Sequence, residues 1–241
     1  MRVALFSDVH GNGVAFDAML ADLERKAVDH LVCLGDHAQG GPQPAECLER
    51  LRELGCPVVM GNSDHFLLTL DPGQEPVTEQ QVATARWSQS RLSDELLEFH
   101  RSFRPTVELD LDGAGSLLAF HGSPRSNEEI LGPWMEEGAF RVVLDGLEAD
   151  VFAGGHIHLQ WSRRCGRPYF VNPGSVGLAY DHHQPEESFR ADAWAEYAIV
   201  TVDGAVGFEF RRVPFDRAAV LRAIDASGMP HPEAARLFWV D

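Results

Sequence analysis

Seven side chains of metal-ligand type stand directly after five short apolar runs of the sequence. The seven residues are Asp8, His10, Asp36, Asn62, His121, His156 and His158. Imidazole nitrogens combined with carboxylate and amide oxygens, without a thiolate, suit Mn, Fe or Zn better than Ca or Mg. Such a set has more donors than one tetrahedral or octahedral site with an open position requires. It therefore indicates two metal ions that share one bridging carboxylate, and such a pair can clamp the attacking and leaving oxygens of an in-line phosphoryl displacement.

Each of these motifs also has a purely structural explanation. An Asp-x-His is common by chance, two histidines one residue apart in a strand merely share a face, and Gly-Asn or Gly-Asp is usually a turn. Their coincidence at five successive strand ends has no such explanation, and it favours metal binding. Three other histidines, His30, His100 and His231, lie in polar or helical segments, where we expect them on the surface.

The elements that must position these ligands begin with an alternation of strands and helices. Short apolar runs predict strands over 2–7, 31–34 and 57–60, and helical spacing of apolar residues predicts helices over 14–26 and 45–54. This order is typical of a largely parallel sheet with helices on its face. Ligands bind outside the carboxyl ends of strands in such sheets, so we expect the seven side chains to converge on one edge.

The rest of the chain mixes helices with antiparallel hairpins. We expect a helical excursion near 64–104, then a hairpin of strands over 106–111 and 116–120 with its turn at Asp112-Gly113. A polar segment over 181–193 interrupts the strand pattern, and we expect a loop there that serves as a lid. The other expected elements are a helix over 139–147, strands over 150–153, 159–164 and 168–171, a hairpin over 197–202 and 205–213, and a last helix over 216–226.

Composition limits the classes of function. The 241 residues fit one domain, and their formal net charge of −17 repels duplex nucleic acid and anionic membranes. No apolar run approaches the length of a membrane span, and the N-terminal run is too short for a secretory signal. The four cysteines form no CxxC pair, so reduced thiols and a cytoplasmic location are expected.

The order of the motifs resembles a known family. The motifs run through Asp8-Val9-His10-Gly11-Asn12, Gly35-Asp36, Gly61-Asn62-Ser63-Asp64, His121-Gly122 and Gly155-His156-Ile157-His158. In this order they resemble the calcineurin-like metallophosphoesterase superfamily over about residues 1–180. The stretches over 35–44 and 172–177 are similar to the small bacterial and archaeal phosphoesterases of that superfamily. The resemblance implies an α/β fold, a four-layer αββα sandwich of two mixed β-sheets flanked by helices, with a dinuclear metal site at the carboxyl ends of the strands.

The resemblance also implies which residues hold each ion. One divalent ion would take Asp8, His10, Asp36 and His158. The other would take Asp36, Asn62, His121 and His156. With Asp36 as the bridge, a hydroxide shared by the two ions would attack phosphorus in line, its pKa lowered from that of bulk water toward neutrality. The ions would also neutralise charge that develops on the phosphoryl oxygens.

The sequence departs from the family pattern at two places. Many members carry a histidine directly after Gly-Asn as general acid or substrate contact, whereas this chain has Ser63, followed by Asp64 and His65. We expect these last two residues to be the candidates for proton transfer, with a helix-start role as the alternative for His65. If neither donates a proton, esters with good leaving groups are favoured over alkyl esters.

The second departure follows the Asn-Pro-Gly-Ser motif. Relatives often continue with a Pro-Arg pair, but Leu178-Ala179-Tyr180 stands here, so an arginine contact to substrate is missing. Asn12 and Arg125 are the candidate substitutes for that contact, each with an alternative role as a turn former or surface residue.

These observations predict a phosphoesterase that hydrolyses a small phosphomonoester, phosphodiester or nucleotide with two divalent transition metal ions, Mn, Fe or Zn, with Ni also compatible. The alternative is a metal-binding protein-interaction scaffold of the same fold with little or no turnover. A nuclease would need a basic groove or aromatic stacking platforms, so nucleic-acid polymers and membranes are disfavoured as partners. The sequence leaves the oligomeric state and the physiological substrate open.

Overall fold

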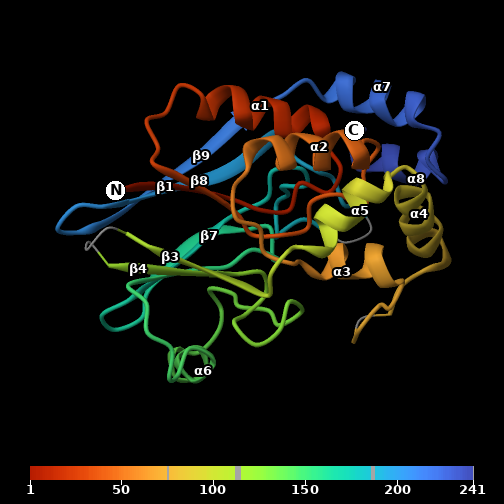
Figure 1. Cartoon of the computed structure of the whole chain (residues 1–241). Coiled ribbons are helices and arrows are strands. Elements are labelled where there is room, and N and C mark those ends of the chain that lie inside the picture. The colour runs from red at the N-terminus through yellow and green to blue at the C-terminus, as the bar shows by residue number, and fades with distance from the viewer. Residues whose placement is uncertain (75, 112–114, 186–187, 241) are drawn as a thin grey trace.

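Two β-sheets form the centre of the computed structural model, which describes residues 1–74, 76–111, 115–185 and 188–240 (Figure 1). The first sheet has the strand order β2-β1-β8-β9, and the second has the order β3-β4-β5-β7-β6. The strands of the first are β2 (His30–Cys33), β1 (Arg2–Phe6), β8 (Trp194–Val202) and β9 (Val206–Pro214). Those of the second are β3 (Thr106–Asp110), β4 (Ser116–Phe120), β5 (Val151–Ala153), β7 (Tyr169–Pro173) and β6 (Gln160–Arg164).

Both sheets mix parallel and antiparallel pairs, and the parallel pairs position the site. β1 runs parallel to β2, with Leu5 opposite Val32. In the second sheet β4, β5 and β7 are parallel, with Ala119 opposite Ala153 and Ala153 opposite Val171. Parallel neighbours end at the same edge of a sheet. The loops that follow β1 and β2, and those that follow β4 and β5, therefore leave their sheets at a common edge.

Four layers result from the period-2 alternation of buried residues along the strands. Ala4 and Phe6 of β1 pack in one cluster with Phe16 of α1 (Gly13–Leu23) and Leu48 of α2 (Pro44–Leu54). Val3 and Leu5 instead pack between the sheets, together with residues of β4 and β5. The outer face of the second sheet carries Phe120, Phe152 and Phe170, which Phe140 of α6 (Glu137–Val143) covers. The fold is the expected αββα sandwich of two mixed sheets (Figure 1).

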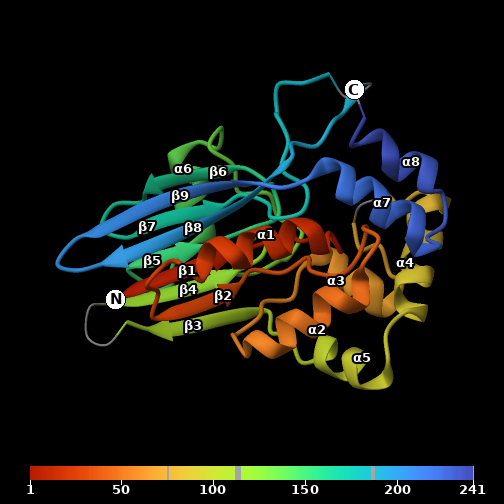
Figure 2. The ribbon, with the colours of Figure 1, turned by 90° about the horizontal axis from the view of Figure 1, so that it is seen from above.

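A group of helices lies at the end of the sandwich where the ligand loops emerge (Figure 2). The segment near 64–104 contains α3 (Asn62–Thr69), α4 (Glu79–Ser90) and α5 (Asp94–Arg101). The C-terminal part adds α7 (Arg217–Ser227) and α8 (Pro232–Leu237). Val220, Ile224, Met229 and Trp239 form a separate apolar cluster there, against which Trp87 of α4 packs. Segments far apart in the chain thus meet beside the ligand loops.

Three elements differ from the sequence-based expectations. The strand expected over 57–60 makes only isolated bridges, Cys33 to Val58 and Val59 to Arg104, because the chain turns at once into α3. The helix expected over 139–147 ends at Val143. α8 was not expected, since six residues between Pro232 and Leu237 are too few for a helical period to stand out. The expected turn at 112–113 lies outside the described residues.

Within the described ranges, no helix has the length and apolar character needed to cross a membrane.

Candidate metal centre

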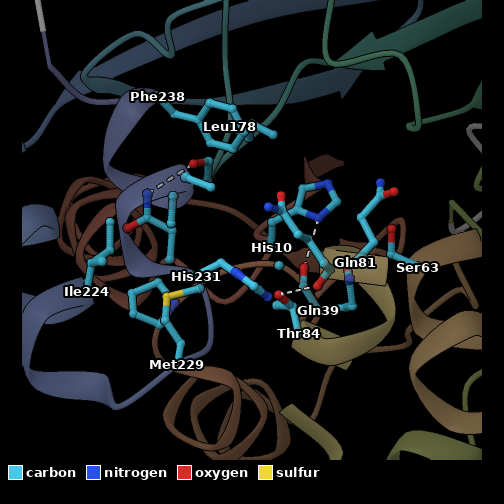
Figure 3. A pocket seen from close by; sticks show the side chains of 18 of the residues that line it. His10, Gln39, Ser63, Gln81, Thr84, Leu178, Ile224, Met229, His231 and Phe238 are labelled. Carbon is cyan, nitrogen blue, oxygen red and sulfur yellow. Dashed lines mark hydrogen bonds between the residues drawn. The ribbon is translucent and has the colours of Figure 1, made fainter. Parts of the chain in front are cut away.

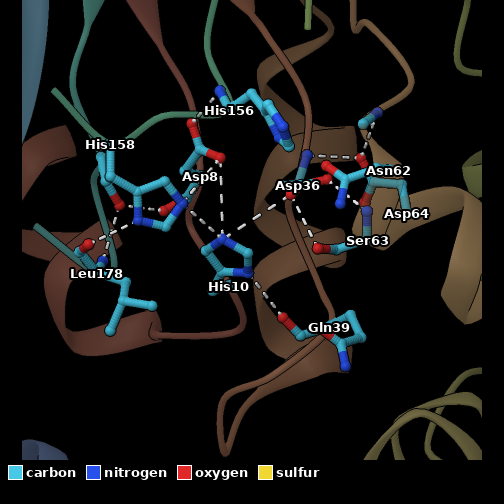
Figure 4. A network of polar contacts seen from close by, with 12 residues as sticks. Asp8, His10, Asp36, Gln39, Asn62, Ser63, Asp64, His156, His158 and Leu178 are labelled. Atoms are coloured by element: carbon cyan, nitrogen blue, oxygen red, sulfur yellow. Dashed lines mark hydrogen bonds and ion pairs between the residues drawn. The ribbon is translucent and has the colours of Figure 1, made fainter. Parts of the chain in front are cut away.

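Six of the seven expected ligands come together in Figure 4, at the edge where the strands of both sheets end, and His121 lies against Asp36 and Asn62 of this group. His158 Nε2 lies 3.2 Å from Asp8 Oδ1, and His121 Nε2 lies 3.4 Å from Asp36 Oδ2. His10 Nε2 lies 3.9 Å from the same Asp36 oxygen. Each pair joins loops from different strands, so the side chains converge as the parallel topology requires. Two groups have ligand atoms close enough together for a metal ion, Asp8 with His10 and His158, and Asp8 with Asp36 and His121.

The backbone at the centre is strained in a way that marks a functional site. Asp8, His10, Asp36, His156 and His158 all have positive φ, between 48° and 72°. A side chain with a Cβ rarely adopts this region, because Cβ then crowds the backbone. Five of the seven ligands are therefore held in a conformation that only the surrounding structure can impose.

Glycines permit the loops to approach each other closely. Gly35 has φ of +104°, and a Cβ there would lie 2.7 Å from the backbone nitrogen of Gly61. A Cβ on Gly61 would in turn collide with the carboxylate of Asp36. Replacing either glycine would therefore displace the loop that carries Asp36.

The first ligand group contains two imidazoles whose Nε2 atoms point at each other. His10 Nδ1 lies 3.1 Å from the carbonyl oxygen of Gln39, and His158 Nδ1 lies 2.8 Å from that of Leu178. Since a carbonyl only accepts, both Nδ1 atoms carry their hydrogens, and in the neutral rings both Nε2 lone pairs are free. The two Nε2 atoms are only 3.1 Å apart. Such a pair needs a positive charge between or beside the rings, either a proton or a metal ion.

Asp8 supplies the acidic ligand of this group. Its side chain is fully buried, and its Oδ1 is among the buried atoms that have no hydrogen-bond partner in the part of the chain that the structure describes. Burial alone would raise the pKa of Asp8, but His158 and His121 together outweigh it and lower the pKa. Burial would likewise lower the pKa of His158, yet Asp8 raises it. An unsatisfied buried carboxylate oxygen beside two imidazoles is chemistry that fits a divalent transition metal.

The second ligand group surrounds His121. Its Nδ1 donates to the carbonyl of Leu34 at 2.7 Å, and its Nε2 lies 3.0 Å from Asn62 Oδ1. Burial would lower the pKa of His121, but Asp36, with smaller contributions from Asp8 and the Leu34 carbonyl, outweighs burial and raises the pKa to about 9. The ring of His156 lies against that of His121, with centroids 5.1 Å apart. Burial, and to a smaller extent the charge of His121, lowers the pKa of His156 to about 4.

Asp36 belongs to the second group, also lies near His10 of the first, and is held by Ser63. The Ser63 backbone N–H donates to Asp36 Oδ1 and its hydroxyl donates to Oδ2, both at 2.8 Å. Burial alone would raise the pKa of Asp36, but the charge of His121 lowers it far below its usual range. The carboxylate is thus ionised and fixed, with one oxygen facing His10 on one side and His121 on the other.

The sequence matches the family model of the calcineurin-like phosphoesterase superfamily domain over residues 1–203. The chain belongs to this superfamily. Members of this superfamily use divalent metal ions, and the candidate ligands are present in this chain.

Relatives in the superfamily match nearly the whole chain. An uncharacterized protein of Methanocaldococcus jannaschii, MJ0912, is 26% identical over 98% of this chain and 97% of its own. The crystal structure of a metallophosphoesterase from Sphaerobacter thermophilus is 27% identical, with a TM-score of 0.74 over 99% of this chain and 98% of that one. Protein PH1004 from Pyrococcus horikoshii, 18% identical, shares the fold with a TM-score of 0.83 over 99% and 98% of the two chains.

Asp64, expected in proton transfer, is instead a positioning residue. Its buried carboxylate accepts from the backbone N–H of Asp36 at 2.7 Å, from that of His37 at 3.0 Å and from that of Gly61 at 3.1 Å. Its Oδ1 also lies 2.9 Å from His100 Nε2. Asp64 therefore ties the loop after β2 to the start of α3, and both loops carry ligands.

His100 corrects a second expectation, since it is completely buried rather than exposed. It shares the buried face of α5 with Leu96, one helical turn away. That spacing is the signal that could have placed His100 inside. Of the other two histidines expected on the surface, His231 is exposed and His30 is half-buried.

The remaining candidates lie at the margin of the centre or away from it. His65 is exposed on α3. Asn12 caps α1, where its Oδ1 accepts from Ala15 N–H and its Nδ2 donates to Gly177 O, so both polar atoms are already bonded. Arg125 is exposed, and its Nε donates to Glu129 at 2.8 Å. It borders a separate cavity whose described lining includes none of the seven ligands.

Sequence reasoning missed the positioning role of the Asn-Pro-Gly-Ser segment. Asn172 Nδ2 donates to Gly155 O at 2.7 Å, which fixes the loop before His156. The Ser175 hydroxyl donates to Asp8 O at 2.8 Å, which fixes the loop after β1. The motif is visible in the sequence, but the partners of its side chains lie too far along the chain to be inferred from spacing.

A cavity of about 420 Å³ opens beside the centre (Figure 3). His10, Asn62 and Ser63 border it at the metal-ligand end. Its opposite wall comes from α7 and α8, including Ile224 and Phe238. The candidate centre is therefore accessible to a small molecule from the side of the C-terminal helices.

Proposed function

We propose that this protein hydrolyses small phosphate esters with two divalent transition metal ions, Mn, Fe or Zn, bound at the candidate centre. The observation that carries the proposal is the pair of Nε2 atoms of His10 and His158, 3.1 Å apart with both Nδ1 atoms bonded to carbonyls. The adjacent unsatisfied oxygen of Asp8 adds an anionic donor at the same place. Together they form a preformed cation site at the edge of a cavity.

Asp36 is the proposed bridge. The first ion would be held by Asp8, His10, Asp36 and His158. The second would be held by Asp36, Asn62, His121 and His156, and the proximity of Asp8 to the second ligand group supports a compact arrangement. When bound, the two ions would supply a water of lowered pKa and would offset charge that develops on the phosphoryl oxygens.

Residues around the proposed centre hold the ligand side chains in their orientations. The carbonyls of Gln39, Leu178 and Leu34 fix which nitrogen of each imidazole faces inward. Ser63 orients both oxygens of Asp36. The buried Asp64 holds the loops that carry Asp36 and Asn62, so that little reorganisation is needed when a substrate arrives.

The site provides little for protonation of the leaving group. The carboxylate of Asp64 is already bonded to three backbone N–H groups and His100, which leaves His65 as the proton donor that we propose. Because His65 is exposed rather than held against the ligands, its contribution is small. We therefore expect esters with good leaving groups, such as aryl phosphates, to be preferred over alkyl esters.

The test is hydrolysis of aryl mono- and diesters by the purified protein with Mn, Zn and Fe supplied in turn. We expect metal-dependent hydrolysis that chelation abolishes and that His158→Ala reduces by at least about a hundredfold. His30→Gln is the matched control, because it changes a histidine that is not a proposed ligand. No hydrolysis with any metal, despite two bound ions, would contradict the proposal and favour the scaffold alternative.

A further inference from the structure

The cavity beside the centre has two walls of different chemistry (Figure 3). Gln39, Gln81 and Thr84 lie on one side, near His10 and Ser63. The opposite side is apolar, and its residues come from α7, α8, the segment between them and the residues that follow α8. Phe238 is 39% exposed there, whereas Ile224, Met229 and Trp239 also line the cavity but are at most 5% exposed. A cavity of about 420 Å³ with one apolar and one polar wall has the size and character of small-molecule sites.

The cavity lacks charged side chains. None of its described lining residues is Asp, Glu, Lys or Arg, although these four types make up 24% of the chain. A second anionic group of a ligand would lose its hydration there without gaining a cationic partner, which is unfavourable. The cavity therefore suits an uncharged group, while the phosphate it carries faces His10 and Asn62.

Amide groups on the polar wall are available to a ligand. Within the described part of the chain, the Gln39 side-chain amide makes no hydrogen bond, because only its backbone carbonyl is used, by His10. The Oε1 of Gln81 accepts from the Thr78 N–H and hydroxyl, and its Nε2 makes no hydrogen bond to the residues that the structure describes. These amides can donate to or accept from hydroxyl, carbonyl or ring-nitrogen atoms of a bound molecule.

The apolar wall is fixed to the metal-ligand loops. The Tyr180 ring lies 5.8 Å from the His158 ring and 4.9 Å from the Phe189 ring, measured between centroids. The Phe189 ring in turn lies 5.3 Å from that of Phe238. The Ala191 N–H also donates to the carbonyl of Phe238 at 2.8 Å. A row of aromatic rings thus sets the distance between α8 and the ligand His158.

The apolar wall lies outside the matched superfamily domain. That domain ends at residue 203, whereas α7 begins at Arg217 and α8 ends at Leu237. The specificity that this wall provides is therefore separate from the metal-binding elements that the superfamily domain contains.

We propose that this cavity binds the organic group of the substrate, and that this group is uncharged and ring-bearing, with an apolar face and a hydrogen-bonding edge, as in a nucleoside 5′-monophosphate. The inference rests on the proposed phosphoesterase function and narrows its substrate class. The apolar face of this group packs against Phe238 and Leu178, and its polar edge faces Gln39 and Gln81. Substrates with further phosphates, such as nucleoside triphosphates, are disfavoured because no lysine or arginine among the described lining residues can pair with them.

The experiment introduces charge on α8 at two positions. Ala234 lines the cavity, whereas Leu237 of the same helix is 56% exposed and does not line it. With the metal-loaded protein, we expect Ala234→Glu to lower kcat/KM for nucleoside 5′-monophosphates by about tenfold or more, mainly through KM. We expect Leu237→Glu to leave kcat/KM unchanged. We expect Ala234→Lys to raise kcat/KM for nucleoside triphosphates relative to monophosphates, and Leu237→Lys to leave this ratio unchanged.

Two controls separate this inference from the function on which it rests. Hydrolysis of p-nitrophenyl phosphate reports on the metal centre, and its absence in the wild type would refute the proposed function. Binding of an unphosphorylated nucleoside to the protein, measured by calorimetry, reports on the cavity without any turnover. If p-nitrophenyl phosphate is hydrolysed but the Ala234 and Leu237 variants behave alike, or if nucleosides do not bind, the inference about the cavity is wrong.

Discussion

Metal binding should release protons from this centre, because protons hold the ligands together when no metal is bound. Asp36 raises the pKa of His121 to about 9 against the ordinary value of 6.5, so at pH 7 this imidazole is almost fully protonated. A metal ion must displace that proton before Nε2 can bind it. Asp8 raises the pKa of His158 in the same direction, so the other ligand group adds to the effect.

The size of the effect follows from the difference between the pKa and the pH. With a pKa of about 9 for His121, proton competition weakens the apparent affinity by about a hundredfold at pH 7 and by about tenfold at pH 8. The apparent affinity should therefore rise about tenfold per pH unit between pH 6 and 8 for the ion that His121 binds. In the opposite direction, acidification should unload the centre.

Isothermal titration calorimetry with Mn²⁺ in buffers of different ionisation enthalpy measures this release. The plot of observed against buffer enthalpy should give at least about one proton released per chain at pH 7. Asp36→Asn removes the charge that raises the His121 pKa, so its remaining binding should lose most of this pH dependence. An affinity that is independent of pH, with no buffer dependence of the enthalpy, would refute the reasoning.

Three further predictions concern individual residues. His100→Ala leaves buried Asp64 without its side-chain partner, and urea unfolding should show a loss of about 3–5 kcal/mol; a loss under about 1 kcal/mol would mean that the pair is not structural. The Asp22 pKa is lowered in the folded protein, because hydrogen bonds from Tyr197 and Arg211 outweigh burial. Ionised Asp22 therefore stabilises the folded state above pH 3.8, and this stabilisation disappears as the pH falls through the folded pKa. Tyr197→Phe should weaken this acid dependence in thermal unfolding, and an unchanged profile would contradict it. His65→Ala should slow hydrolysis of alkyl esters more than of aryl esters; equal effects on both would exclude it as the proton donor.

Most strands and helices could be predicted from the sequence because buried strands and amphipathic helices leave periodic patterns. The periodicity alone indicated a largely parallel sheet, whereas the αββα sandwich of two mixed sheets was implied by the resemblance to the superfamily. The strand ends also predicted that the seven candidate ligands converge, since a residue directly after a buried strand must emerge at the edge of the sheet; their role as ligands stays a prediction. These patterns do not show which side chains far apart in the sequence contact each other. Asp64 and His100 are 36 residues apart, and nothing local shows that they meet.

Backbone strain and short elements were also beyond the sequence. Asp and His adopt positive φ more often than most residues, but residue type does not show that Asp8 and His158 do so here, because the completed fold imposes it. α8 is too short to show a period, yet it supplies a wall of the cavity. The features that determine ligand geometry and access were therefore the ones that local patterns could not reveal.

The central claim is that one carboxylate, Asp36, serves two metal ions in one centre. Metal content per chain after chelation and reconstitution with Mn²⁺ tests it most directly, in the wild type and in the variants Asp36→Asn and His158→Ala. The account predicts two ions in the wild type, reduced occupancy of both sites together in Asp36→Asn, and reduced occupancy of only one site in His158→Ala. Two ions still bound in Asp36→Asn would contradict the bridging role of Asp36.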